Sequence, residues 1–368
     1  MTAETDANVR EDHRIGLPAI FAAFFWLGVT SFGGNTAAWL YHRIVQRRHW
    51  VKDAEFLSDV ALGRIVPGSG GVNLTVQVGQ RLRGAAGAVA AVVGLLSGPL
   101  VIVLAFAVIY TRIGWSPAVH AVLDGIAAAA IGLTFATGLK LLPSGSARLG
   151  PLAVTLASVL CVGVLRWSML PGFYAWRRSA SAWHCCRAAM PDDFRTLLTL
   201  VLVFVPLSLL SIGGGASLLA DMEHQSVAVH GWTTAREFAD LFAISRAAPG
   251  PGTMLSALIG WKAAGWRGAV TATIALYLPS SLLVYGAARL WGRWCGTVWH
   301  TAVERGLSPV AAGLLLSGGI AVLRVSPGGW AIWVAAIVAA VLLLRWPRLH
   351  PLALFATCGA LFGLAGLW

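Results

Sequence analysis

Residues 64–68 read Arg-Ile-Val-Pro-Gly, and residues 246–250 read Arg-Ala-Ala-Pro-Gly. Both stretches follow short apolar pieces in which a helix is the expected conformation. Proline removes a backbone donor and glycine permits a positive φ, so each Pro-Gly pair should break or kink its helix. The same break, with an arginine at the same distance before it, therefore occurs once in each half of the chain.

The matching stretches belong to a longer repeat. Residues 31–34 read Ser-Phe-Gly-Gly, and residues 211–214 read Ser-Ile-Gly-Gly, 180 positions later. Trp50 is followed by Glu-Phe at 55–56, and Trp232 is followed by the same pair 182 positions further on. Ordered matches at nearly constant spacing indicate a duplicated unit.

The chain around these motifs is too apolar for an ordinary water-soluble enzyme. Of its 368 residues, 57% are hydrophobic and 11% are charged, whereas a soluble domain has about 25% charged residues. The 27 basic residues are scattered between apolar runs, which is typical of membrane-protein loops and argues against a nucleic-acid partner. These features predict an all-α polytopic membrane protein whose partner is the lipid bilayer.

Composition divides the chain into four parts. We expect a polar N-terminal tail at 1–14, a first transmembrane repeat at 15–166, a basic linker at 167–195 and a second transmembrane repeat at 196–368. The apolar runs predict about five helical elements in each repeat, some of them broken.

The two repeats are predicted to have inverted topology. The loop at 41–53 carries four basic residues and one acidic residue, whereas the equivalent loop at 221–237 carries one basic and three acidic residues. Short cytoplasmic loops collect Lys and Arg, so these equivalent loops are expected on opposite sides of the membrane.

Paired breaks in two repeats point to a binding site. Broken helices are tolerated at membrane depth only where they are buried in protein or line a wet cavity, and they commonly mark the substrate site of a transporter. The N-terminus of a half-helix presents unpaired N–H groups with partial positive charge, which suits an oxyanion. The alternative is that the glycines serve close helix packing. The predicted site residues at the breaks are Gly33, Gly34, Gly213, Gly214, Pro67, Gly68, Ser69, Asn73, Pro249, Gly250 and Thr253.

Arg64 and Arg246 complete the predicted substrate site. Each lies three positions before a Pro-Gly break, and an arginine in an apolar segment is by default a functional-site hypothesis. Its fixed donors suit a planar or tetrahedral oxyanion. The alternative is that each extends to the membrane surface or caps a carbonyl.

Acidic residues are sparse within the apolar runs, which favours an anionic substrate over a cation. Asp59 and Asp240 are near-equivalent in the two repeats and are candidates to pair with Arg64 and Arg246. The alternative for both carboxylates is a solvated or capping role.

The motifs resemble those of the chromate ion transporter (CHR) family. Residues 25–34 read Phe-Trp-Leu-Gly-Val-Thr-Ser-Phe-Gly-Gly, and Trp50, the Glu-Phe pair at 55–56, the Pro-Gly pair at 67–68 and Asn73 follow in order. The chain is similar to the two-domain long form of the family. The resemblance implies export of chromate from the bacterial cytoplasm across the inner membrane, and chromate resistance.

Two positions depart from the family pattern. The first break reads Pro-Gly-Ser at 67–69, whereas the second keeps the common Pro-Gly-Pro at 249–251. The position that matches Asn73 is Leu255. The site is therefore expected to be asymmetric.

Together these observations predict a secondary transporter rather than an enzyme. The chain has no GxxxxGK[ST] motif, so an ion gradient or exchange is the expected energy source. No cofactor or metal is expected, because the nine histidines and five cysteines show no ligand or nucleophile-and-base spacing. A transporter of sulfate or another tetrahedral oxyanion is the nearest alternative, a membrane-embedded reductase or lipid transferase is a more distant one, and a homodimer is left open.

Overall fold

The computed structural model describes residues 15–32, 36–113, 116–142, 149–164, 191–211, 214–291, 298–326, 329–346 and 349–365. The described residues form helices joined by short turns, with no β-strand among them. The prediction of an all-α membrane fold is confirmed. Most of the basic linker and the polar N-terminal tail lie outside the described residues.

The first half contains α2 (Leu17–Thr30), α3 (Thr36–Leu40), η1 (Tyr41–Arg47), α4 (Asp53–Ile65), α5 (Gly70–Ile113), α6 (Pro117–Lys140), α7 (Leu149–Ser158) and η2 (Val159–Val164). The second half contains α10 (Asp192–Leu210), η3 (Gly215–Leu218), α11 (Leu219–Glu223), η4 (His224–Val229), α12 (Ala235–Ala247), η5 (Gly252–Met254), α13 (Leu255–Trp291), α14 (Val298–Val325), α15 (Gly329–Arg345) and α16 (Pro351–Ala365). From α2 to α6 the described helices follow the same order as from α10 to α14, apart from two short 3-10 turns, η3 and η5, in the second half.

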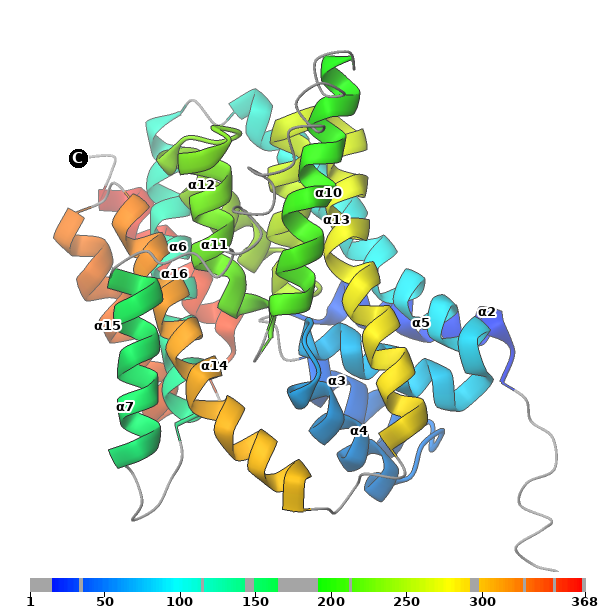
Figure 1. Cartoon of the computed structure of the whole chain (residues 1–368). Coiled ribbons are helices and arrows are strands. Elements are labelled where there is room, and N and C mark those ends of the chain that lie inside the picture. The colour runs from blue at the N-terminus through cyan, green and yellow to red at the C-terminus, as the bar shows by residue number, and fades with distance from the viewer. Residues whose placement is uncertain are drawn as a thin grey trace, which may run out of the picture.

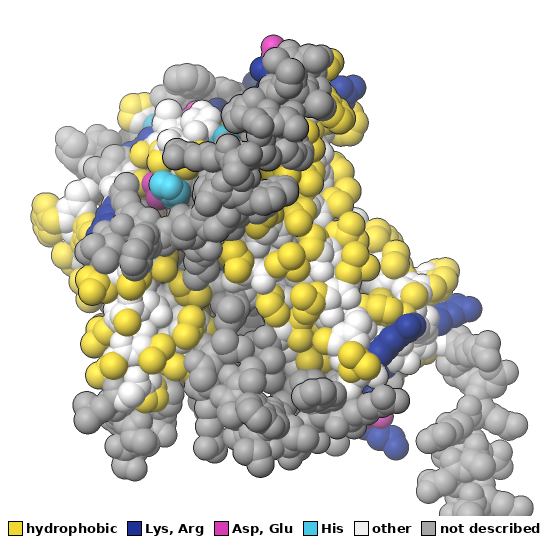
Figure 2. Space-filling view, viewed as in Figure 1, with side chains coloured by type: hydrophobic (Ala, Val, Ile, Leu, Met, Phe, Trp, Pro, Cys, Tyr) yellow, Lys and Arg dark blue, Asp and Glu magenta, His cyan; other side chains and the backbone are white. Residues whose placement is uncertain are grey.

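The protein crosses the membrane several times. Among the described residues, four helices, in α5, α6, α10 and α13, are long and apolar enough to span it, and five shorter apolar helices accompany them. Hydrophobic side chains cover the middle of the face in Figure 2, while the visible charged side chains gather toward its upper and lower edges. This distribution fits a protein surrounded by lipid.

The duplication seen in the sequence has structural counterparts. A π-helix, η1 or η4, precedes the loop before a 13-residue helix, α4 or α12, in each half. Phe24 and Phe204 occupy equivalent positions and are both fully buried. At 1.5 Å per residue, a 13-residue helix is about 20 Å long, shorter than the roughly 30 Å hydrocarbon core. Helices α4 and α12 therefore end inside the protein, at the Pro-Gly breaks.

The helices after the breaks are themselves sharply bent at equivalent points. Backbone angles leave the helical region at Arg83 and Gly84 in α5 and at Ala264 and Gly265 in α13. A Cβ placed on Gly79 would lie 2.6 Å from the carbonyl oxygen of Gly87, so the two pieces of α5 pack backbone against backbone. The first piece is thus held as a short helix that begins at the break.

The helices gather into two groups (Figure 1). On one side α2 packs on α5, α10 packs on α13, and α5 and α13 pack on each other. On the other side α6 packs against α14, α15 and α16, and α14 also contacts α7. Helix α12 packs against both α6 and α13. Helices α4 and α12, which end at the Pro-Gly breaks, contact helices of both groups, since each packs against α5, α13 and α14.

Candidate functional site

The first Pro-Gly break follows the end of α4, and the second follows the end of α12. Val66 N–H donates to the carbonyl of Leu62 at the end of α4, and Ala248 N–H donates to Ile244 at the end of α12. After each break, the next helix starts with N–H groups that have no intrahelical partner. Each break therefore places a helix C-terminus beside a helix N-terminus.

The breaks of the two repeats bind one another reciprocally. Gly68 N–H donates to the carbonyl oxygen of Ser211 at 2.8 Å, and Gly250 N–H donates to the carbonyl oxygen of Ser31 at 2.7 Å. Each Pro-Gly turn is thus tied to the Ser-x-Gly-Gly segment of the other repeat. We refer to these two hydrogen-bonded contacts as the crossings.

Glycine is required at both crossings. Gly68 has φ +132° and Gly250 has φ +102°, a region that other residues rarely adopt. A Cβ on Gly250 would lie 2.5 Å from Pro99 Cβ, and one on Gly68 would lie 2.7 Å from Ser280 Cβ. The positive φ and the close approach both exclude a side chain here.

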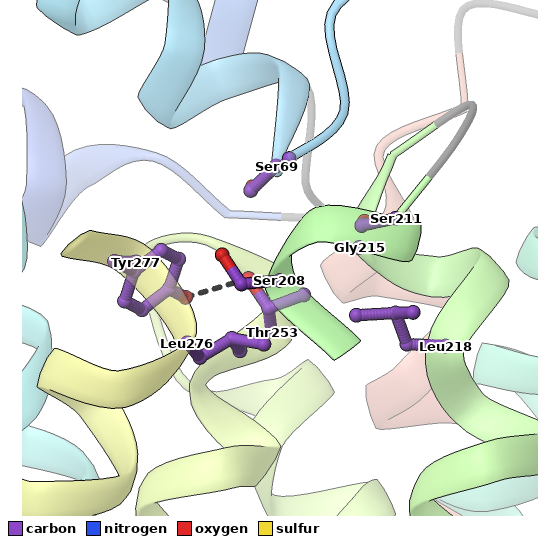
Figure 3. A pocket seen from close by; sticks show the side chains of 9 residues that line it. Ser69, Ser208, Ser211, Gly215, Leu218, Thr253, Leu276 and Tyr277 are labelled. Atoms are coloured by element: carbon purple, nitrogen blue, oxygen red, sulfur yellow. Dashed lines mark hydrogen bonds between the residues drawn. The ribbon is translucent and has the colours of Figure 1, made fainter. Parts of the chain in front are cut away.

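A small cavity lies at the crossing made by Gly68 and Ser211, with about 170 Å³ of empty space that is partly open to solvent. Figure 3 shows the hydroxyl of Tyr277 hydrogen-bonded to that of Thr253, at an Oη–Oγ1 distance of 2.6 Å. The Ser211 hydroxyl is buried without a hydrogen-bond partner. The cavity is lined by Gly68, Ser69, Ser208, Ser211, Gly215, Leu218, Thr253, Leu276 and Tyr277. It is a pocket whose polar groups are mainly neutral hydroxyls.

Arg246 supplies positive charge beside this pocket without lining it. The residue is partly exposed, but its Nε and Nη2 atoms are buried and have no hydrogen-bond partner. The guanidinium lies 5.2 Å from the centre of the Phe242 ring and packs against Gly252. Gly252 directly precedes Thr253, whose side chain faces the cavity. A buried guanidinium with unused donors is suited to an anion.

The predicted site residues fall into several groups. Gly68, Ser69 and Thr253 line the cavity. Gly214 is described, with φ +108°, and directly precedes the lining residue Gly215. Pro67, Pro249 and Gly250 shape the breaks but do not line the cavity. Gly33, Gly34 and Gly213 lie outside the described residues, as does the side chain of Arg64, whose backbone belongs to the last turn of α4.

Asn73 is engaged by the first break itself. Its Nδ2 atom donates to the carbonyl oxygens of Val66 at 3.1 Å and Pro67 at 3.2 Å. These bonds satisfy carbonyls freed by the end of α4. The second repeat has Leu255 at this position, so the expected asymmetry consists here of a side-chain cap present in one break only.

The expected pairing of Asp59 and Asp240 with the two arginines is wrong. Both oxygens of Asp59 accept hydrogen bonds of 2.7 Å from Arg81. Asp240 accepts from the Tyr110 hydroxyl at 2.7 Å and lies 3.0 Å from Nδ1 of His120. Residues of other helices provide these partners, and the spacing along α4 or α12 carries no signal for them.

Sequence reasoning did not assign six of the lining residues to the site, namely Ser208, Ser211, Gly215, Leu218, Leu276 and Tyr277. Ser211 belongs to the repeated Ser-x-Gly-Gly motif, so the motif contained a signal for it. Tyr277 lies within an uninterrupted apolar run, and only the packing of α13 brings its hydroxyl to Thr253. In the described part of the chain, no three His, Cys, Asp or Glu side chains are grouped to hold a metal ion.

Comparison with known proteins identifies relatives along most of the chain. The family model described as chromate transporter matches residues 18–177 and 198–364. A chromate transport protein of Cupriavidus metallidurans is 24% identical over 89% of this chain and 87% of its own. A probable chromate transport protein of Synechococcus elongatus is 25% identical over 76% of this chain and 78% of its own. An uncharacterized transporter of Methanocaldococcus jannaschii is 25% identical over 72% and 74%. No solved structure matches.

Proposed function

Because this chain belongs to the chromate transporter family, we propose that it is a secondary transporter that exports chromate from the bacterial cytoplasm across the inner membrane and thereby confers chromate resistance. The observation that carries this proposal is the reciprocal crossing of the two breaks, one of which carries a pocket with hydroxyl groups in its lining. The relatives named as chromate transport proteins supply the substrate.

The chemistry around the pocket suits a tetrahedral dianion. Hydroxyls of Ser211, Thr253 and Tyr277 offer hydrogen bonds to oxyanion oxygens. The nearby α5 begins at Gly70, so its first N–H groups and partial positive charge lie beside Ser69. Arg246 adds a full positive charge from behind Gly252. We assign substrate binding to these groups, together with the predicted glycines of the breaks and Arg64.

The position of the pocket suits alternating access. Its lining comes from both repeats, since Gly68 and Ser69 follow α4 while the remaining lining residues belong to the second half. A small movement of one repeat against the other would therefore change which side of the pocket is covered.

Transport by purified protein in sealed liposomes tests the function. We expect chromate to accumulate in the liposomes with its oxidation state unchanged, and sulfate to compete at comparable concentration because the two anions share charge and shape. Reduction of the chromium would instead establish an enzyme. Transport of sulfate without any chromate transport would favour the sulfate alternative.

Reporter fusions test the inverted topology. Fusions placed after Arg48 and after Val229 follow equivalent π-helices, η1 and η4. The opposite charges of segments 41–53 and 221–237 predict that the two reporters lie on opposite sides of the membrane. The expectation that 221–237 is a loop is wrong in part, because Asp221 and Glu223 are buried in α11. Reporters on the same side would show that the repeats are parallel.

A further inference from the structure

A second polar cluster lies away from the pocket, where α12 meets α5 and α6. Asp240 of α12 accepts a 2.7 Å hydrogen bond from the Tyr110 hydroxyl of α5. Its Oδ2 atom lies 3.0 Å from Nδ1 of His120 in α6. Arg236, one turn earlier on α12, lies 3.0 Å from Asp124 of α6 and 3.7 Å from Asp240 Oδ1. None of these residues lines the pocket.

The central carboxylate is buried but incompletely satisfied. The Asp240 side chain is 1% exposed, and its Oδ1 atom has no hydrogen-bond partner. A buried carboxylate oxygen without a hydrogen bond is costly, and a bound proton removes that cost. His120 is 27% exposed, so it connects the buried carboxylate with the protein surface.

The carboxylate of Asp59 is buried like that of Asp240 but is fully hydrogen-bonded. Asp59 is 3% exposed and is therefore buried to a similar extent, but each of its oxygens accepts a hydrogen bond from Arg81. That pair has no unfilled acceptor and behaves as a structural contact between α4 and α5. Burial alone does not distinguish Asp240; its unfilled oxygen and its histidine neighbour do.

The other charged groups that face this cluster have charged partners of their own. Asp124 Oδ1 also has no hydrogen-bond partner, but Asp124 Oδ2 accepts a 3.0 Å hydrogen bond from the Arg236 guanidinium, which Asp240 does not. Glu237 is paired with Lys262 of α13 at 2.7 Å and accepts a hydrogen bond from Thr234 N–H at 2.9 Å. Among the described residues, the exchangeable proton is therefore best placed between Asp240 and His120.

We propose that Asp240, with His120 as its connection to water, binds the proton that is exchanged for the oxyanion. This inference rests on the proposed transport function. A proton from water binds the imidazole of His120, moves to a carboxylate oxygen of Asp240, and leaves on the other side after the conformational change. No bond other than those to the proton is made or broken, and no electrons are transferred.

Helix α12 links this proton site to the substrate site. Neutralising Asp240 weakens its attraction to His120 and Arg236 and so loosens the contact between α12 and α6. The same helix carries Arg246 two turns later and ends directly before the break that contains Gly250. Proton binding and anion binding thus act on the middle and on the C-terminal end of one short helix.

The test uses full-length protein in liposomes that contain a pH-sensitive dye, with chromate as the probe. For wild-type protein, an imposed gradient of one pH unit should change the chromate accumulation ratio by about tenfold for each proton exchanged. The dye should report proton movement that depends on chromate. Asp240→Asn should lose both responses, and His120→Gln should slow the proton movement. Asp59→Asn is the matched control, because Asp59 is buried but both of its oxygens accept hydrogen bonds. This variant should keep both the accumulation response and the chromate-dependent proton movement.

An independent readout does not require transport. Infrared difference spectra recorded across a pH titration should show a protonated carboxyl in wild-type protein that is absent from Asp240→Asn. Folding of each variant is checked by thermal unfolding in detergent. Wild-type response to the gradient by Asp240→Asn, or identical infrared spectra, would overturn the proton site. Absence of chromate movement in wild-type protein under every gradient would instead overturn the proposed function, and the infrared result would still decide the proton site.

Discussion

The two crossings share a backbone but differ in their side chains. Each is closed by one hydrogen bond from a Pro-Gly turn to the serine before a Gly-Gly pair, at 2.8 Å and 2.7 Å. The cavity, however, lies at the crossing of Gly68 with Ser211 and takes most of its lining from the second repeat. In the first repeat, the positions that match Tyr277 and Thr253 are Leu96 and Gly71, neither of which has a hydroxyl.

A glycine–threonine contact in each repeat explains how the two crossings keep the same backbone with different side chains. In the first repeat, Gly71 packs against Thr36, with 2.7 Å between a Cβ placed on the glycine and Thr36 Cβ. In the second repeat the roles are reversed, because Thr253 packs against Gly215. Each repeat needs one small residue where its two breaks meet. Placing the threonine on the Pro-Gly side directs a hydroxyl into the pocket, so the repeats preserve the backbone scaffold while only one of them supplies most of the polar lining.

Replacing the arginines has the largest expected effect on transport. Arg64→Ala and Arg246→Ala should each abolish chromate transport while membrane insertion is retained. A hydrogen bond to a charged group contributes about 1.5–3 kcal/mol, so loss of even one should weaken anion binding roughly 10- to 150-fold. Chromate uptake and binding measure this. Arg195→Ala, which removes a partly exposed arginine 3.4 Å from Asp192, is the control. Wild-type transport by both site variants would remove the arginines from the site.

Adding a methyl group at either crossing should have the next largest effect. Gly250→Ala and Gly68→Ala combine a positive φ, which costs roughly 1–2 kcal/mol, with a steric clash. Both should lower thermal stability and slow transport at least about tenfold. Gly231→Ala has φ +61° and open space around the new Cβ, so it tests the φ cost alone. If only one crossing is sensitive, the scaffold is less symmetric than its hydrogen bonds indicate.

Removing the paired hydroxyls should have a moderate effect confined to the second repeat. Thr253→Val and Tyr277→Phe each break the 2.6 Å contact, and one hydrogen bond of about 1 kcal/mol corresponds to roughly fivefold weaker chromate binding. The double variant should be little worse than either single variant, because the two groups act together. Ser97→Ala removes a hydroxyl next to Leu96, the first-repeat position that matches Tyr277, and should bind chromate like wild-type protein. An equal loss in Ser97→Ala would contradict the assignment of the pocket to one repeat.

Making the first break resemble the second should have the smallest effect on transport. Asn73→Leu introduces the residue found at Leu255 and removes the donors to Val66 and Pro67. Loss of these bonds to buried carbonyls should lower the free energy of unfolding by about 1–3 kcal/mol, as measured by chemical denaturation in detergent. Chromate affinity should change less than twofold, because Asn73 does not line the pocket. A large loss of affinity at unchanged stability would return Asn73 to the binding site.

Much of the fold could be predicted because its causes are local. The apolar run at 84–111 corresponds to the long second piece of α5, and the apolar piece before Pro67 corresponds to α4. Hydropathy reports which segments leave water, and Pro-Gly pairs report where a helix stops, whatever surrounds them. The exchange of hydrogen bonds between the two repeats could not be read from these signals.

The sequence by itself determined that the protein is a duplicated, helical membrane protein whose helices break at equivalent points, because hydropathy, proline and glycine act on the segment that contains them. Only the tertiary structure decided which side chains meet. It placed the Tyr277 hydroxyl on Thr253, 24 residues away, and the Tyr110 hydroxyl on Asp240, 130 residues away. Such contacts depend on how separate helices pack, and a hydroxyl within an apolar run has no neighbour in the sequence that announces its partner.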